Sequence, residues 1–436
     1  MKQYWIETYG CQMNKAESES LELMLGERGW ESAQDPLEAE LIILNTCSVR
    51  KTAEDRIWGR LGFYKPLKAR RDFRLVLMGC MAERLKSEIL NRAPHIDILV
   101  GNFQKHRLPD FIEKEAGRRE LRIDPGEYHF SDLHYTSGFQ AFVPIMHGCD
   151  NLCTYCVVPY VRGPEVSRSV ESIMLEVSRL DSASVREITL LGQNVNSYCY
   201  SNRGGDGGLV RFPDLLKVLV KKLDRIEWVR FLTSHPKDFS EALIELIGGE
   251  RAICRHIHLP VQHGSDRILM KMGRGYSRGR YLKLIDRIKK RLGEVSLTTD
   301  ILIGFPGETE ADFRKLLELM REVEFDDAFT YRYNPREGTR AFQLEDSVTD
   351  AEKQERLTRI IELQRAISRK RKTKKLGKSF KVLVEGVSRK NKKELLGRTE
   401  SNEMVVFPAS GEKIGHFVRV GLISINGNTF VGKEDN

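Results

Sequence analysis

Residues 146–159 read MHGCDNLCTYCVVP and hold Cys149, Cys153 and Cys156 at C-x3-C-x2-C spacing. Thiolates are soft ligands, so this loop indicates zinc or an iron–sulfur cluster. A structural zinc site is normally closed by a fourth Cys or His, and His147 lies too close to Cys149 to be a good candidate. A four-iron cluster held by three cysteines keeps one iron open to a small molecule. A zinc loop and a redox C-x-x-C pair are the alternatives.

The composition is typical of a folded chain, and 436 residues suffice for two or three domains. No apolar run reaches about 18 residues, so no membrane span is expected. The first residues lack an apolar signal core, which predicts a cytoplasmic protein. In a reducing compartment the eight cysteines favour metal ligands or free thiols over disulfides. The net charge of +9 indicates a polyanionic partner such as nucleic acid, or simply a solvated basic surface.

The first 125 residues alternate strand and helix patterns, which predicts an open parallel sheet with crossover helices. The expected strands are Lys2–Tyr9, Leu41–Asn45, Arg74–Met78 and Ile96–Val100. The expected helices are Asn14–Arg28, Lys51–Arg70 and a helix that begins at Ala82.

Three more cysteines occupy equivalent places in this pattern. Cys11, Cys47 and Cys80 follow the first, second and third predicted strands, in the strings YGCQMN, NTCSVR and MGCMAE. The carboxyl ends of parallel strands share one edge of a sheet, where ligands bind. We therefore expect a second three-cysteine cluster at this edge. The alternative is three ordinary buried cysteines.

The central part, residues 126–360, begins with a polar segment, Asp124–Ser137, that is predicted to be a linker. Six strand–helix units follow, which are too few for a closed eight-stranded barrel and predict a partial (β/α)6 barrel. The cysteine loop follows the first strand and therefore belongs at the mouth of the barrel, where barrel enzymes place their chemistry. The expected strands are Ala141–Met146, Glu187–Leu191, Trp228–Thr233, His256–Val261, Leu297–Ile303 and Ala328–Tyr333. The expected helices include Val170–Arg179, Pro213–Lys222, Arg278–Arg291 and Asp312–Arg321.

Polar residues at the other strand ends are candidates to line a cofactor or substrate pocket. They include Gln193, Asn194, Ser234 and His235. The alternative is turn chemistry and helix capping.

Other features carry no site. Cys199 and Cys254 have no partner at metal spacing and are expected to be non-ligands, because a lone Cys is usually a small core residue. The string Gly273-Arg274-Gly275 follows a helical stretch and is not a dinucleotide fingerprint.

Residues 361–436 change to a pattern of short strands. A helix over Glu352–Arg371 leads into the basic run Arg369–Lys375, RKRKTKK. Short strands punctuated by Gly and Asn then predict a small β-barrel of the kind that binds nucleic acid. They are expected at Phe380–Val387, Leu395–Thr399, Met404–Pro408, His416–Ser424 and Thr429–Gly432. Lys and Arg suit contacts with RNA phosphates, and a solvated basic face is the alternative.

The three parts in this order resemble the radical S-adenosylmethionine (SAM) methylthiotransferase family, and the resemblance covers essentially the whole chain. Its strings are YGCQMN, NTCSVR, GCMAER, GCDNLCTYCVVPYVRGPEVSRS, LLGQNVNSY, LPVQHGSD and DILIGFPGETE. The resemblance implies an N-terminal methylthiotransferase domain over 1–125, a radical SAM domain over 126–360 and a TRAM domain over 361–436. One departure is His263, where the family pattern has a serine.

Within the family, NTCSVR and CVVPYVRGPEVSRS look most like the MiaB-type tRNA enzymes, which methylthiolate isopentenyladenosine beside the anticodon. The resemblance implies that Cys149, Cys153 and Cys156 hold a 4Fe-4S cluster whose open iron binds SAM, the source of a deoxyadenosyl radical. It implies a second, auxiliary 4Fe-4S cluster on Cys11, Cys47 and Cys80 that takes part in sulfur delivery. It also implies that Gln193, Asn194, Ser234 and His235 lie near SAM or the adenosine, which completes the predicted site.

The implied partners are the anticodon stem-loop of tRNA, an electron-donor protein and iron–sulfur supply proteins. The TRAM domain and the run Arg369–Lys375 would bind the stem-loop, whose splayed bases enzymes can reach. The alternatives are a methylthiotransferase for threonylcarbamoyl-adenosine in tRNA or for a ribosomal protein, and a zinc-stabilised RNA-binding protein without activity.

Overall fold

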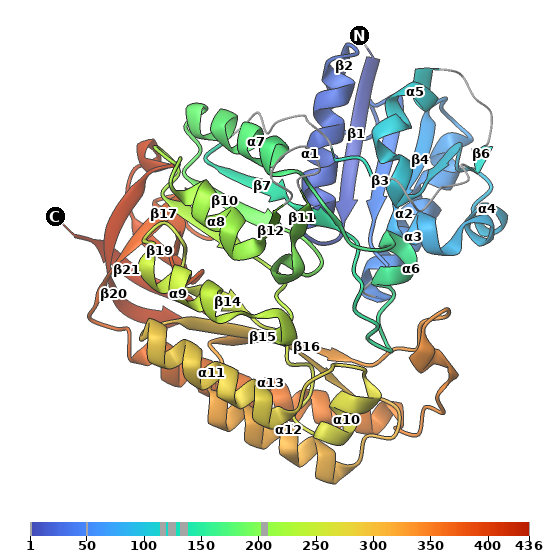
Figure 1. Cartoon of the computed structure of the whole chain (residues 1–436). Coiled ribbons are helices and arrows are strands. Elements are labelled where there is room, and N and C mark those ends of the chain that lie inside the picture. Colours follow the sequence, from blue (N-terminus) through green and yellow to red (C-terminus); the bar gives the residue numbers. More distant parts are fainter. Residues whose placement is uncertain are drawn as a thin grey trace.

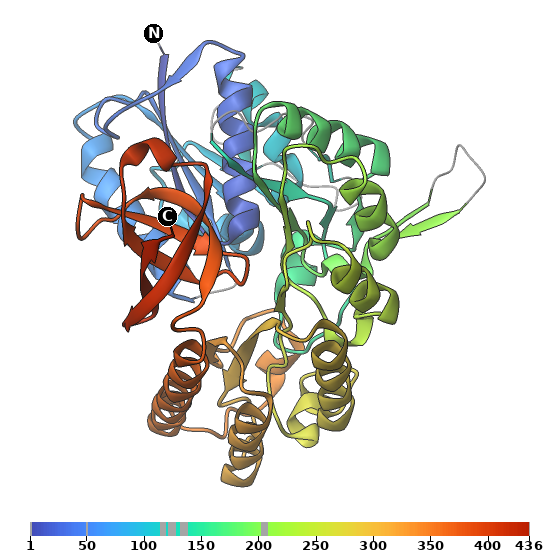
Figure 2. The same cartoon turned by 90° about the vertical axis from the view of Figure 1, so that its left-hand side faces the viewer.

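The computed structural model describes residues 2–48, 51–113, 119–120, 128–130, 138–201 and 208–435. Figure 1 shows an N-terminal α/β unit in blue and cyan, a central unit from green to orange, and a C-terminal β-barrel in red. Figure 2 shows the red barrel above the helix that leads into it. The predicted fold class is thereby confirmed.

The N-terminal unit is a parallel sheet with strand order β2-β1-β3-β4-β5-β6. Its strands are β1 Lys2–Tyr9, β2 Trp30–Ser32, β3 Leu41–Thr46, β4 Arg74–Gly79, β5 Ile98–Val100 and β6 Arg119–Glu120. Its helices are α1 Gln12–Gly26, α2 Lys51–Lys68, α3 Cys80–Leu85, α4 Ser87–Arg92, the 3-10 helix η1 Asn102–Arg107 and α5 Leu108–Glu113. The short strands β2 and β6 were not predicted, since two or three residues give no readable periodicity.

The central strand β3 explains why this sheet is recognisable in the sequence. All six of its residues are buried, as expected for a parallel strand that is covered on both faces. Ile42 and Leu44 belong to the hydrophobic cluster on one face, and Leu41 and Ile43 to the cluster on the other.

The central unit is a partial barrel of six parallel strands in two groups of three, β7-β10-β13 and β14-β15-β16. A parallel bridge between Val229 and Ile253 joins the two groups. The strands are β7 Gln140–Pro144, β10 Glu187–Leu191, β13 Trp228–Phe231, β14 His256–His258, β15 Ser296–Ile303 and β16 Asp327–Arg332. The covering helices are α7 Val170–Ser182, α8 Phe212–Val220, α9 Glu241–Gly249, α10 Asp266–Lys271, α11 Arg278–Leu292 and α12 Glu310–Val323.

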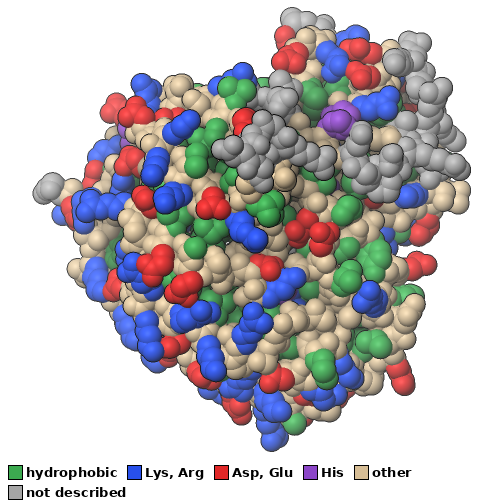
Figure 3. All heavy atoms as spheres, viewed as in Figure 1, with side chains coloured by type: hydrophobic (Ala, Val, Ile, Leu, Met, Phe, Trp, Pro, Cys, Tyr) green, Lys and Arg blue, Asp and Glu red, His purple; other side chains and the backbone are tan. Residues whose placement is uncertain are grey.

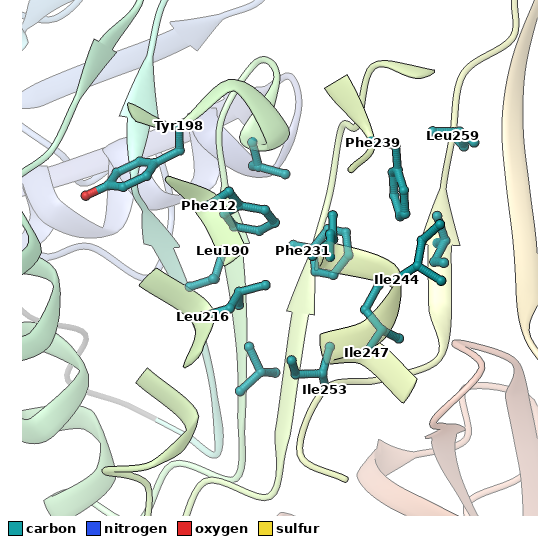
Figure 4. Close-up of a cluster of buried hydrophobic side chains, with 14 of the residues drawn as sticks. Leu190, Tyr198, Phe212, Leu216, Phe231, Phe239, Ile244, Ile247, Ile253 and Leu259 are labelled. Carbon is teal, nitrogen blue, oxygen red and sulfur yellow. The ribbon is translucent and has the colours of Figure 1, made fainter. Parts of the chain in front are cut away.

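The largest hydrophobic cluster lies between these strands and their helices. Figure 4 shows Leu190 of β10 and Phe231 of β13 beside Phe212 and Leu216 of α8. Smaller elements surround the cysteine loop and the strand ends. They are β8 Met146–His147, α6 Val158–Arg162, β9 Val166–Ser167, η2 Val195–Ser197, β11 Cys199–Ser201, β12 Leu209–Arg211, η3 Pro236–Asp238 and η4 Arg340–Gln343.

The C-terminal unit is a closed barrel with strand order β17-β18-β19-β21-β20. The long helix α13 Asp350–Thr373 leads into it. Its elements are β17 Ser379–Val387, β18 Glu394–Thr399, β19 Met404–Pro408, η5 Gly411–Lys413, β20 Phe417–Asn426 and β21 Thr429–Glu434.

The small barrel packs against the first residues of the central strands. Arg398 forms an ion pair of 2.8 Å with Glu187, where β10 begins. The ring of Phe417 lies 4.6 Å from that of Trp228, where β13 begins. The small barrel therefore covers the end of the partial barrel that is opposite to its mouth, as Figure 1 shows.

The domain boundaries remain predictions. The boundary placed between residues 360 and 361 falls inside α13, which packs on the central unit through Ile360 and Ile367. Most of the linker predicted over Asp124–Ser137 lies outside the described residues, apart from 128–130.

Candidate active site

The three N-terminal cysteines lie at one edge of the sheet because their strands are neighbours. Cys11, Cys47 and Cys80 follow β1, β3 and β4, which are adjacent in the strand order. Thr46 pairs with Tyr9 on one side and with Gly79 on the other. Since neighbouring strands lie about 4.8 Å apart, the three cysteine loops start side by side. Cys47 and Cys80 are buried, whereas Cys11 is exposed.

Two buried asparagines hold the loops of this edge together. Asn14 Nδ2 donates to Asn45 Oδ1 at 3.0 Å and to the Thr46 carbonyl at 3.1 Å. Asn45 Nδ2 donates in turn to the Asn14 carbonyl at 2.8 Å. Asn14 Oδ1 also lies 3.3 Å from the Cys11 thiol. The paired amides therefore fix α1, which begins beside Cys11, against the end of the strand that precedes Cys47.

The three cysteines of the C-x3-C-x2-C motif lie on the loop between β8 and α6, after the first barrel strand. Each has a nitrogen donor near its sulfur. Asn151 Nδ2 lies 3.5 Å from Cys149 Sγ, Arg274 Nη1 lies 3.3 Å from Cys153 Sγ, and the Val158 amide lies 3.5 Å from Cys156 Sγ. Donors of this kind stabilise negative charge on sulfur and tune iron–sulfur clusters.

Two thiols of this loop, those of Cys149 and Cys156, are poor acids without a metal. Burial, together with the charge of Cys153, raises the pKa of Cys156 to about 12, and burial also raises the pKa of Cys149. Within the described part of the chain, no three Cys, His, Asp or Glu side chains converge on a position for a single metal ion. In a four-iron cluster each cysteine ligates a different iron, so convergence on one point is not required. Three thiols on one loop with nitrogen donors fit such a cluster, which would deprotonate them.

The predicted pocket residues divide into two kinds. Asn194 is fully engaged, since its Nδ2 donates to Asp238 Oδ2 at 2.7 Å and its Oδ1 accepts from the His235 amide at 3.1 Å. Gln193 Oε1, Ser234 Oγ and His235 Nε2 are buried, and each has no hydrogen-bond partner among the described residues. Unpartnered buried polar atoms are rare in folded proteins, and a bound ligand or water would satisfy these three.

His235 is neutral in this environment. Burial and the positive charges of Arg274 and Lys237 lower the pKa of His235 to about 2. Its Nδ1 accepts from the Lys237 amide at 3.3 Å, and its ring lies 5.6 Å from that of Tyr276. The unpartnered Nε2 therefore carries the proton and can act as a donor to a ligand.

His263, which departs from the family pattern, is completely buried. Its Nδ1 accepts from the Ser265 amide at 3.0 Å, and its Nε2 lies 3.5 Å from Glu308 Oε2. Glu308 also forms an ion pair of 2.9 Å with Arg356. The departure is thus accommodated inside the fold.

Two arginines near the cysteines were missed by the sequence reasoning. Arg274 is buried beside Cys153 and also donates to the Pro260 carbonyl at 2.7 Å. Arg162, at the end of α6, is buried between the central unit and the N-terminal unit and bonds to Glu17 at 2.9 Å. No spacing rule links either residue to its cysteines, although Arg162 lies in a string that carries the family resemblance.

The basic run Arg369–Lys375 is largely used inside the chain. Arg371 bonds to Asp326 at 2.7 Å, Lys375 bonds to Glu403 at 2.7 Å, and Lys370 pairs with Glu324. Arg369 and Lys374 are exposed. Figure 3 shows many basic side chains on the left and lower parts of the viewed face, where Figure 1 places the small barrel and α11–α13. None of the helices in the described segments combines the length and apolar character of a membrane span.

Family models match three parts of the chain. Residues 3–101 match the uncharacterized protein family UPF0004, residues 143–320 match the radical SAM superfamily, and residues 373–431 match the TRAM domain. The fold also resembles that of solved radical SAM proteins. The TM-score is 0.57 at 14% identity with the methyltransferase TsrM from Kitasatospora setae, over 76% of this chain and 73% of that chain. It is 0.52 at 12% identity with the cobalamin-dependent enzyme OxsB, over 84% of this chain and 56% of that chain.

Curated relatives match over nearly the full length. A protein of Treponema denticola is 49% identical over 98% of both chains, and one of Moorella thermoacetica is 43% identical over 97% of this chain and 96% of its own. A protein of Dictyoglomus thermophilum is 42% identical over 97% of this chain and 96% of its own. All three are named tRNA-2-methylthio-N(6)-dimethylallyladenosine synthase. The chain therefore belongs to this family of radical SAM methylthiotransferases.

Proposed function

We propose that this enzyme methylthiolates C2 of a dimethylallyl-modified (isopentenyl) adenosine next to the anticodon of tRNA. The observation that carries the proposal is the pair of cysteine triads, one at the mouth of the partial barrel and one at the facing edge of the N-terminal sheet. The helix α6 begins two residues after Cys156 and packs against α3, whose first residue is Cys80. Two sites in such contact suit a reaction in which one site activates the substrate and the other delivers sulfur.

In this proposal Cys149, Cys153 and Cys156 hold the 4Fe-4S cluster that binds SAM, and Cys11, Cys47 and Cys80 hold an auxiliary 4Fe-4S cluster. When bound, the first cluster and SAM supply the radical chemistry, which belongs to the cofactor. Arg274 places a buried positive charge beside Cys153. Gln193, Ser234 and His235 offer their unpartnered polar atoms to SAM or to the adenosine. Asn194 acts indirectly, because it positions His235.

The substrate is a stem-loop in this proposal, because a splayed loop base can reach a barrel mouth that a paired base cannot. The TRAM barrel would contact RNA phosphates together with Arg369 and Lys374, two exposed cations of the basic run. An electron-donor protein and iron–sulfur supply proteins are the further partners that the chemistry requires. The cytoplasm, which holds the tRNA, is the expected compartment.

The test begins with iron and sulfide content and an absorption spectrum of anaerobically reconstituted protein. About eight irons per chain would support two four-iron clusters of the kind that cysteines hold. About four irons would leave one triad empty and refute the two-cluster proposal. Zinc without iron would refute both cluster assignments.

The substrate is tested by incubation with SAM, a reductant and anticodon stem-loops. We expect methylthio product on RNA that carries the isopentenyl group and none on the unmodified stem-loop, on the threonylcarbamoyl-adenosine form or on ribosomal protein. Product on either of the last two substrates alone would overturn the substrate assignment and keep the reaction class.

A further inference from the structure

The side-chain amide of Asn102 connects the helix α6, which follows Cys156, with the N-terminal cysteine triad. Asn102 Nδ2 donates to the carbonyl of Val161, in α6, at 2.6 Å and lies 3.4 Å from Cys80 Sγ. The next residue of α6 is Arg162, which is only 3% exposed. The segment that follows Cys156 thus reaches directly to the N-terminal cysteines.

The guanidinium of Arg162 is only partly satisfied. Its Nη1 donates to Glu17 Oε1 at 2.9 Å and lies 3.3 Å from His147 Nδ1. Its Nη2 is buried without a hydrogen-bond partner among the described residues. Burial alone would lower the pKa of Arg162, but the charges of Cys80, Glu17 and Cys11 hold this pKa well above its usual range. Cys80 and Cys11 therefore lie within electrostatic reach of the guanidinium.

Among the residues that the structure describes, the buried charges around Arg162 do not balance. Lys105, which is 8% exposed, shares Glu17 with Arg162, so two cations face one carboxylate. His147 adds no negative charge in either protonation state. Burial raises the pKa of Tyr128, which stacks on His147 at 3.5 Å, so the phenol stays neutral. Glu83 pairs with Lys86 at 3.7 Å and also lies within electrostatic reach of Lys105. The three cations Arg162, Lys105 and Lys86 therefore face the two carboxylates of Glu17 and Glu83.

An uncompensated buried charge is strongly unfavourable, so this net positive charge requires an anion nearby. Three thiolates around a four-iron core of charge +2 leave one negative charge in excess, which equals the excess on the protein side. We propose that Arg162 is a positioning residue for the auxiliary site, which balances the charge of the cluster held by Cys11, Cys47 and Cys80 and directs Nη2 toward it. This inference rests on the proposed auxiliary cluster.

The test uses the full-length chain with Cys149, Cys153 and Cys156 all replaced by Ala, which retains only the auxiliary triad. After reconstitution, the midpoint potential of the remaining cluster is measured by a redox titration followed by electron paramagnetic resonance. Arg162→Gln removes a neighbouring positive charge and should disfavour the reduced cluster at least tenfold. For a one-electron couple, tenfold corresponds to a shift of about 59 mV to more negative potential. Arg162→Lys keeps the charge and should recover most of this shift.

The matched control is Arg230→Gln. Arg230 is also 3% exposed and also bonds to a buried glutamate, Glu187, at 2.7 Å. It lies at the boundary with the small barrel, where its Nη1 donates to the Glu400 carbonyl at 2.6 Å. The Arg230→Gln variant should have the same midpoint potential as the background protein. Equal potentials in the Arg162 and Arg230 variants would overturn the inference while the auxiliary cluster stands.

Two further outcomes concern a background variant without iron and an Arg162 variant that does not fold. A background variant that takes up no iron would refute the auxiliary cluster itself, and the role of Arg162 with it. If Arg162→Gln does not fold, as judged by circular dichroism, Lys105→Gln removes one charge from the same network and should lower the potential in the same direction. An unchanged midpoint potential in a folded Lys105→Gln variant would contradict the proposal that this network balances the charge of the auxiliary cluster.

Discussion

Arg274 Nη1 lies 3.3 Å from Cys153 Sγ, although 121 residues separate the two in the chain. Arg274 follows α10, and the cysteine loop is bonded to the end of the same helix, since the Thr154 amide donates to the Met272 carbonyl at 3.0 Å. The cysteine loop follows the first strand group, β7-β10-β13. It is therefore supported by α10, which belongs to the second group, β14-β15-β16. This contact places a positive charge where the SAM-binding cluster is proposed.

Replacement of Cys153 tests the first triad, which consists of Cys149, Cys153 and Cys156. Cys153→Ala should abolish reductive cleavage of SAM, because a cluster needs all three thiolates, and should leave RNA affinity unchanged. The measurements are deoxyadenosine formation by chromatography and stem-loop binding by fluorescence anisotropy. Cys199→Ala, at an exposed cysteine on β11, is the control and should keep full SAM cleavage. SAM turnover in the Cys153 variant would remove the first-triad assignment.

Replacement of Cys47 tests the N-terminal triad, which consists of Cys11, Cys47 and Cys80. Cys47→Ala should spare SAM cleavage and stop formation of the methylthio product, because the sulfur-delivering cluster is lost while the barrel is intact. Iron content should fall by about four per chain, as for one four-iron cluster. Mass spectrometry of the digested RNA checks the product. Methylthio product from this variant would show that the N-terminal triad has no part in sulfur transfer.

Gly79 tests the backbone that precedes Cys80. Its φ of +104° is rarely open to other residues, and an added Cβ would lie 2.4 Å from the Thr46 carbonyl oxygen. Gly79→Ala should lower the free energy of unfolding by about 1–3 kcal/mol and reduce iron uptake at the N-terminal edge. Gly62→Ala, on the exposed side of α2 with no atom within 4 Å of the added Cβ, should instead stabilise by roughly 0.5–1 kcal/mol. Denaturant titration compares the two.

The pH dependence of His235 follows from its pKa of about 2 in the folded chain. The unfolded chain, with an ordinary pKa of about 6.5, binds the extra proton first. The contribution of His235 to stability is therefore fully present above about pH 6.5 and is lost as the pH falls toward 2. The nuclear magnetic resonance signal of this imidazole should not titrate between pH 5 and 8. A midpoint inside that range would contradict the neutral donor role.

The exposed part of the basic run predicts a change in RNA affinity. Arg369→Ala with Lys374→Ala should weaken stem-loop binding, and the slope of log affinity against log salt should become shallower by about one unit for each lost phosphate contact. Arg371→Gln serves as the comparison. Arg371 bonds to Asp326 at 2.7 and 3.0 Å, so its loss should reduce stability and leave the salt slope unchanged. Equal slopes in all variants would place the RNA contacts elsewhere.

Much of the fold could be predicted from the sequence because its central strands are covered on both faces. The all-buried strand Leu41–Thr46 stands out from any surroundings, and β1, β10 and β19 have the predicted bounds. Elements with little apolar content, such as β2 with one buried residue, give no such signal. The basic run was predicted from composition alone, and composition does not reveal that Arg371 and Lys375 have acidic partners inside the chain.

The sequence by itself determined which six cysteines are the candidates for two triads. Soft ligands at close spacing predict one triad, and a cysteine after each of three predicted parallel strands predicts the other, because the carboxyl ends of parallel strands share one edge of the sheet. Only the tertiary structure decided which charges surround them. Arg274 meets Cys153 across the central unit, and Arg162 bonds to Glu17 across the boundary with the N-terminal unit. Long-range packing of buried charges of this kind leaves no periodicity in the chain.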